Sequence, residues 1–85
     1  MIPKSRELID AREATAALLE QLNLKAYLFE VEADEDAWIV RVEWDRDGEW
    51  QTLAMPVQWD QLLDSRSDSK VRASLLKQWR DQLMN

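Results

Sequence analysis

The sequence predicts an α+β fold with the order helix, three-stranded antiparallel meander, short helix and C-terminal helix, both long helices packing on one sheet face. Three observations predict it. Apolar residues recur every three to four positions near both ends of the chain, they alternate with period two in the middle, and an Asp-Gly dipeptide separates two alternating segments. At 85 residues, we expect one domain over residues 1–85 with one modest core.

The first helix is expected from about Pro3 to Asn23. Pro3 suits a first helical turn, because the N–H that proline lacks would have no intrahelical partner there. The apolar positions follow at spacings of three and four, with strong helix formers between them: Leu8, Ala11, Ala14, Leu18, Leu19 and Leu22.

Two segments with period two are then expected to form strands. Over residues 27–33 the inner face would hold Tyr27, Phe29, Val31 and Ala33, and the other face Leu28, Glu30 and Glu32. Over residues 38–44 the inner face would hold Trp38, Val40, Val42 and Trp44. The polar segment Asp34-Glu35-Asp36-Ala37 between them is typical of a hairpin loop.

Asp47-Gly48 predicts a two-residue hairpin turn, since a type I′ turn needs positive φ at both central positions. In that register apolar residues face each other, with Val42 opposite Leu53 and Val40 opposite Met55, and Trp44 faces Gln51. A three-residue loop would place Val42 opposite Thr52 instead, so the pattern favours the shorter turn. We expect Pro56 to end the third strand directly after Met55.

The remaining residues predict two further helices. A short helix or turn over residues 57–63 would place Trp59, Leu62 and Leu63 inward. After a connector rich in helix-capping residues, a long helix is expected from about Ser69 to Met84. Its packing stripe would hold Val71, Leu75, Leu76, Trp79 and Leu83.

The composition argues against most site chemistry. The chain has no cysteine and no histidine, which removes thiolate chemistry, the commonest transition-metal ligand and the commonest general base near neutral pH. Glu30 and Glu43 share a sheet face, but nothing predicts a pocket around them, and salt bridges to Arg41 and Lys25 are the expected role of such carboxylates. We therefore expect no enzyme activity, no catalytic residue and no cofactor.

Two carboxylate clusters remain as candidate metal sites. One lies at residues 34–36 and the other at residues 45–49, and either has the oxygen ligands that Mg²⁺ or Ca²⁺ prefers. Neither matches the twelve-residue calcium loop with its distal Glu. We interpret both as solvated hairpin tips and expect no metal.

The N-terminal residues continue into a charged helical pattern instead of the apolar core of a signal peptide. No apolar run approaches the length that spans a membrane. We therefore expect a cytoplasmic protein without membrane contact.

Charge is distributed unevenly along a chain of net charge -6. Residues 25–64 carry eleven acidic and three basic residues, whereas residues 65–85 carry five basic and two acidic ones. The order of elements also occurs in double-stranded-RNA-binding domains, which hold phosphates with basic clusters. The acidic loop at residues 34–36 and the pI of about 4.5 argue against RNA binding, so a nucleic-acid partner is not expected.

Trp50 falls on the sheet face opposite the helices, which a single layer of helices does not cover. It is an interface residue, an exposed ring without a role, or a ring covered by the arms of Arg41 and Arg46. Leu28, Ile39 and Ala54 would form an apolar island with it. The candidate interaction surface comprises Leu28, Ile39, Arg41, Glu43, Trp50 and Thr52.

These features favour a non-catalytic protein-protein interaction or regulatory module that uses this outer sheet face. The partner is another protein or a second copy, and one version is a two-fold homodimer in which the acidic sheet of one copy meets the basic helix of the other. Alternatively, the basic helix offsets acids of its own chain. A different hypothesis is an acidic nucleic-acid mimic that inhibits a DNA-handling protein; the eleven basic residues count against it.

Overall fold

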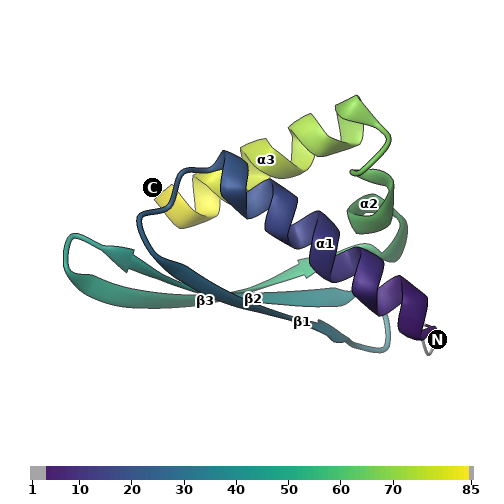
Figure 1. Ribbon diagram of the computed structural model, residues 1–85, viewed down its shortest axis with the longest axis horizontal. Coiled ribbons are helices and arrows are strands. Elements are labelled where there is room, and N and C mark those ends of the chain that lie inside the picture. The colour runs from purple at the N-terminus through teal and green to yellow at the C-terminus, as the bar shows by residue number, and fades with distance from the viewer. Residues whose placement is uncertain (1–3, 85) are drawn as a thin grey trace.

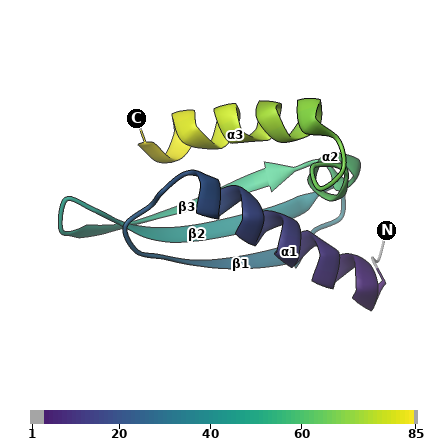
Figure 2. The ribbon, with the colours of Figure 1, turned by 45° about the horizontal axis from the view of Figure 1, so that its top comes forward.

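Helices and sheet form two layers, with all three helices on one side of the sheet (Figures 1 and 2). The computed structural model describes residues 4–84. The predicted α+β order is confirmed. Its elements are α1 (Ser5–Gln21), β1 (Tyr27–Ala33), β2 (Trp38–Arg46), β3 (Glu49–Val57), α2 (Trp59–Asp64) and α3 (Ser69–Met84).

Helix α1 begins and ends through local backbone contacts. The backbone N–H of Lys4 donates to Oε1 of Glu7 at 3.0 Å, which satisfies a donor at the helix start. Asn23 has a φ of 56°, the left-handed conformation that commonly follows a helix, and the helix therefore ends at Gln21, two residues earlier than expected. The expected start at Pro3 lies outside the described residues.

The sheet has the order β1-β2-β3 and is antiparallel throughout. Asp47 and Gly48 have φ values of 55° and 88°, as a two-residue turn requires, and the Gly48 N–H donates to Oδ1 of Asp45 at 3.0 Å. The predicted register is confirmed: Val42 lies opposite Leu53, Val40 opposite Met55 and Trp44 opposite Gln51. The tip of the β2–β3 hairpin extends past the end of the helix layer (Figure 1).

The prediction that Pro56 ends the third strand is wrong. Strand β3 continues to Val57, and Pro56 lies opposite Ile39 within it. Ladder bonds alternate along an antiparallel strand, and the two-residue turn makes Arg46 and Glu49 a hydrogen-bonded pair. The odd-numbered residues of β3 therefore bond to β2. Pro56 tolerates its position because its missing N–H would point to the free edge of the sheet.

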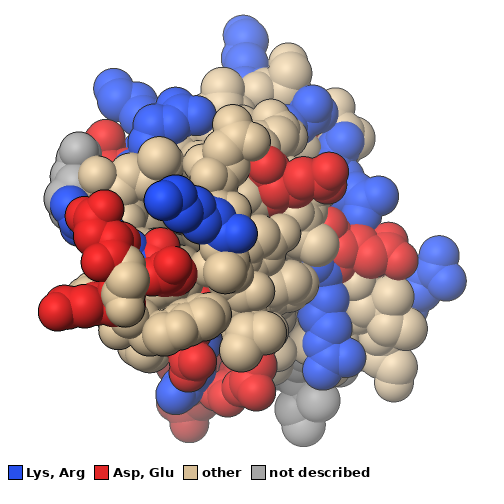
Figure 3. Space-filling model, turned by 60° about the vertical axis from the view of Figure 1, so that its left-hand side comes forward, with Lys and Arg blue, Asp and Glu red and all other residues tan. Residues whose placement is uncertain are grey.

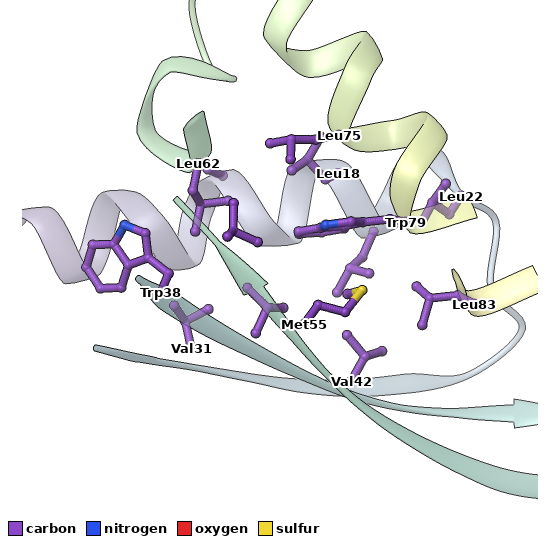
Figure 4. Packing of buried hydrophobic residues seen from close by; sticks show 14 of the residues in the cluster. Leu18, Leu22, Val31, Trp38, Val42, Met55, Leu62, Leu75, Trp79 and Leu83 are labelled. Atoms are coloured by element: carbon purple, nitrogen blue, oxygen red, sulfur yellow. The ribbon is translucent and has the colours of Figure 1, made fainter. Parts of the chain in front are cut away.

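The core lies between the sheet and the helices (Figure 4). Trp38 and Trp79 are almost completely buried, and the ring of Trp38 meets that of Trp59 edge to face with centroids 4.7 Å apart. Trp44 is also buried, as predicted, whereas Trp59 is only half-buried. The other large buried side chains come from both layers: Leu18, Leu19, Leu22, Val31, Val40, Val42, Met55, Val57, Leu62, Leu75 and Leu83.

The connector between α2 and α3 is held by Arg72. Its Nε donates to the carbonyl of Ser65 at 2.9 Å, and its Nη2 donates to the carbonyl of Arg66 at 3.4 Å. Ser65 is buried, and its hydroxyl donates to the Leu62 carbonyl at 2.7 Å. Asp68 then caps α3 by accepting from the backbone N–H of Lys70 at 2.9 Å.

Candidate functional site

The sheet face opposite the helices, here called the outer face, carries the candidate residues. Successive side chains of a strand point to opposite faces of the sheet, so the strand register shows which residues lie on the outer face. They are Leu28, Glu30 and Glu32 from β1, Ile39, Arg41, Glu43 and Asp45 from β2, and Trp50, Thr52, Ala54 and Pro56 from β3.

The register places four of the six candidate residues beside one another. Leu28, Glu43 and Thr52 form one row across the three strands. Arg41 lies in the next row, between Glu30 and Ala54. With Phe29 and Glu30, these four line a shallow hollow of about 420 Å³.

Trp50 and Ile39 lie at opposite ends of the face. Trp50 is paired with Asp45 near the hairpin turn, and Ile39 lies between Glu32 and Pro56 at the far end. Polar residues of the two middle rows separate them. The apolar island expected from Trp50, Leu28, Ile39 and Ala54 is thus not continuous, because Leu28 and Ala54 lie among the polar residues of the two middle rows.

Two large apolar side chains on this face are exposed. Leu28 exposes 64% of its surface and Trp50 57%, whereas Ile39 is half-buried. They lie on different strands, Leu28 on β1 and Trp50 on β3. Exposed Trp at an interface buries a large area at a small cost in conformational entropy, so Trp50 is the strongest single anchor that the face offers.

The outer face is acidic. Four carboxylates share it with one guanidinium: Glu30, Glu32, Glu43, Asp45 and Arg41. Arg41 Nη2 lies 3.5 Å from Glu32 Oε2, and both side chains are about half exposed. Since solvent screens such a pair, it stabilises the fold by at most about 1 kcal/mol. Arg41 thus forms a salt bridge on this face, as predicted, but its partner is Glu32 and not Glu30 or Glu43, and the expected bridge to Lys25 is not found within residues 4–84.

Helix α3 carries the opposite charge on the other side of the sheet, whereas α1 and α2 contain more acidic than basic residues. Lys70, Lys77 and Arg80 are exposed on α3. In Figure 3 Lys and Arg side chains lie along the top, where Figure 1 shows α3, and Asp and Glu gather at the lower left and bottom. A two-fold dimer that joins the acidic sheet to the basic helix in both directions needs the two surfaces side by side. Here a sheet-to-helix contact would instead repeat head to tail and build a ring or an open chain of copies.

Comparison with family models, curated proteins and solved structures finds no match. Within residues 4–84, no three acidic side chains come together in a group that would hold a metal ion. None of the described helices combines the length and the apolar character needed to cross a membrane.

One feature of the site was not predicted from the sequence. A second hollow, of about 490 Å³, lies beside the free edge of β1 and is lined by Arg12 and residues 29–32. Alternation alone identifies the faces of β1, but it does not show that α1 brings Arg12 alongside its edge. The signal available in advance was the strand order, since the first strand of a three-stranded meander always lies at an edge.

Proposed function

We propose that this chain is a non-catalytic protein-binding module that engages a partner protein through the outer face. The observation that carries the proposal is the exposure of Leu28 and Trp50, at 64% and 57%, on a sheet face that the described helices leave uncovered. An antiparallel sheet normally has one solvated face, and its alternate positions are then polar. Contact with solvent alone does not account for two large apolar residues on that face.

The arrangement of polar groups supports a protein partner. Protein interfaces combine large apolar anchors with a polar, hydrogen-bonding rim. Here Trp50 and Leu28 flank Glu43 and Thr52, so an incoming surface would meet ring and aliphatic area beside hydrogen-bond acceptors. The carboxylates would favour a partner surface that is basic and would raise its association rate at low salt.

The test is site-specific photocrosslinking in the source cells. p-Benzoylphenylalanine replaces Thr52 on the outer face in one variant and Lys77 on α3 in a matched control, since both positions are exposed. We expect a defined adduct from position 52 that is absent from position 77 and is lost when Trp50→Ala is added. An adduct of twice 10.0 kDa that yields peptides of this chain alone on mass spectrometry would identify the partner as a second copy.

Two results would reject the proposal. One is no adduct from position 52 at all, and the other is the same set of adducts from positions 52 and 77. Far-UV circular dichroism of each variant verifies that the fold is retained, so that loss of an adduct reports on the surface.

A further inference from the structure

The free edge of β1 presents unpaired backbone groups in a regular pattern. The N–H of Asp45 donates to the Ala26 carbonyl at 3.0 Å, and the N–H of Asp34 donates to the Ala37 carbonyl at 2.9 Å. Both bonds join residues that lie opposite each other in the β1–β2 register, so the even-numbered residues of β1 bond to β2. The odd-numbered residues consequently direct their N–H and C=O groups away from the sheet: Tyr27, Phe29, Val31 and Ala33.

The other edge of the sheet is less suited to accept a strand. On β3 the outward-directed residues are the even-numbered ones, and Pro56, which has no N–H, is among them. Proline on an edge strand is a common obstacle to further pairing. Strand β1 contains neither proline nor glycine, so its edge offers four donors and four acceptors in sequence.

The space beside β1 is open to an added chain. The hollow of about 490 Å³ lined by Arg12 and residues 29–32 runs along the middle of this edge. On the inner side the half-buried Phe29 borders it, which provides apolar surface for side chains of an incoming strand.

Charge at this edge selects the occupant. On the outer face β1 carries Glu30 and Glu32; Glu32 is paired with Arg41, whereas Glu30 forms no ion pair with any residue of the described range 4–84. Side chains directly across an antiparallel pair interact, and like charges there are destabilising. Lys or Arg on the outer-facing positions of an added strand would therefore be favoured.

Charge disfavours two registers in which a second copy could pair with this edge. If two copies paired their β1 strands by two-fold symmetry in the fully aligned register, the two Glu30 carboxylates would lie directly opposite each other. The next register toward the carboxyl end would place each Glu30 opposite a Glu32. Both arrangements bring like charges together, which is unfavourable, whereas the register shifted toward the amino end would place Glu30 opposite Leu28.

From these observations we propose that β1 accepts, by antiparallel strand addition, an extended segment of a partner protein in which Lys or Arg alternates with apolar residues. Main-chain bonds to Phe29 and Val31 provide affinity, and the carboxylates of Glu30 and Glu32 select the basic positions. This binding site at the β1 edge goes beyond the proposed function of the outer face, because binding there requires neither Trp50 nor the rest of β3.

The probe is the labelled heptapeptide Lys-Val-Lys-Val-Lys-Val-Lys, with binding followed by fluorescence anisotropy. In an antiparallel pair the valines, which lie on the inner face, exchange main-chain bonds with β1, and the lysine N–H groups point away. N-methylation of the valines is therefore expected to weaken binding at least about tenfold, because each methyl group removes one donor. N-methylation of the two central lysines serves as the matched control and should leave Kd nearly unchanged.

Variants of the protein complete the test. Glu30→Gln and Glu32→Gln are expected to weaken binding of the unmethylated peptide about two- to fivefold each, as for cross-strand charge pairs. Trp50→Ala should leave peptide binding unchanged, even if it abolishes the adducts at position 52. In amide exchange, the peptide should protect Phe29 and Val31, whose N–H groups are otherwise free of ladder bonds.

Equal affinities for the three peptides would overturn strand addition and show that the peptide is held by charge alone. Unchanged exchange at Phe29 and Val31 in the presence of saturating peptide would overturn it as well. Neither result affects the outer face, whose own test depends on Trp50.

Discussion

Trp44 and Trp50 lie on opposite faces of the same hairpin, six positions apart, and the two-residue turn at Asp47-Gly48 places them there. Trp44 is 6% exposed and belongs to the core, whereas Trp50 is 57% exposed on the outer face. Tryptophan therefore packs in the core at position 44 on β2, whereas at position 50 on β3 its ring is open to solvent.

Substituting these two tryptophans should separate stability from binding. Trp44→Ala is expected to lower the free energy of unfolding by about 3–5 kcal/mol, because it leaves a cavity in a packed core. Trp50→Ala should change it by no more than about 0.5 kcal/mol, as for other surface substitutions. Urea unfolding followed by far-UV circular dichroism measures both. A large loss in Trp50→Ala would mean that the ring is structural.

Gly48 is required for its conformation and not for space. Its φ is 88°, and a Cβ at this position would meet no atom within 4 Å. Gly48→Ala is therefore expected to cost about 1–2 kcal/mol from the left-handed backbone alone. Gly48→Asn should cost less, because Asn tolerates positive φ. Equal urea midpoints for Gly48→Ala and the parent would contradict this account.

Proline substitution along β3 should alternate in its effect. Gln51→Pro removes an N–H that bonds to Trp44 and should cost about 1–3 kcal/mol for the unsatisfied carbonyl, in addition to any local distortion. Thr52→Pro removes an N–H that points to the free edge, as Pro56 does, and should cost clearly less. Thermal unfolding of the two variants measures the difference. The reverse order would contradict the ladder assignment that also underlies the β1 edge.

Arg72 and Arg66 should differ in their contribution to stability. Arg72 is half-buried and bonds two backbone carbonyls of the connector, so Arg72→Gln should destabilise the fold by about 1–3 kcal/mol. Arg66 pairs with Glu13 at 3.2 Å between two exposed side chains, and Arg66→Gln should cost less than about 1 kcal/mol. Urea unfolding at high and low salt tests this, since only the Arg66 effect should fall as salt rises.

The register of the sheet is the part of the fold that sequence reasoning predicted best. The two-residue turn at Asp47-Gly48 and the alternation of apolar and polar residues in both strands each predict that Val42 lies opposite Leu53, so two independent constraints agreed. Pro56 was mispredicted because its effect in a strand depends on the direction of its N–H. The direction of that N–H follows from the register, so it could have been predicted from the sequence.

The binding surfaces were less predictable. Period two placed Leu28 and Trp50 on one face, but their exposure depends on what packs there. The hollow beside β1 depends on the path of α1 over the sheet, which brings Arg12 next to Phe29 although the two lie far apart in the chain. Helical periodicity predicts which side of α1 is buried, and it does not predict the line along which the helix crosses the strands.

The two-residue turn and the strict alternation around it also limit how this protein can change length. Deleting or inserting one residue within β2 or β3 would exchange the inner and outer faces from that point to the turn, burying carboxylates and exposing Val42 or Met55. Unless a bulge absorbs the extra residue, we expect such changes to be tolerated best in the polar stretches, at residues 34–37 or in the connector before α3. Natural variants of different length should therefore differ in those two places and keep the hairpin at constant length.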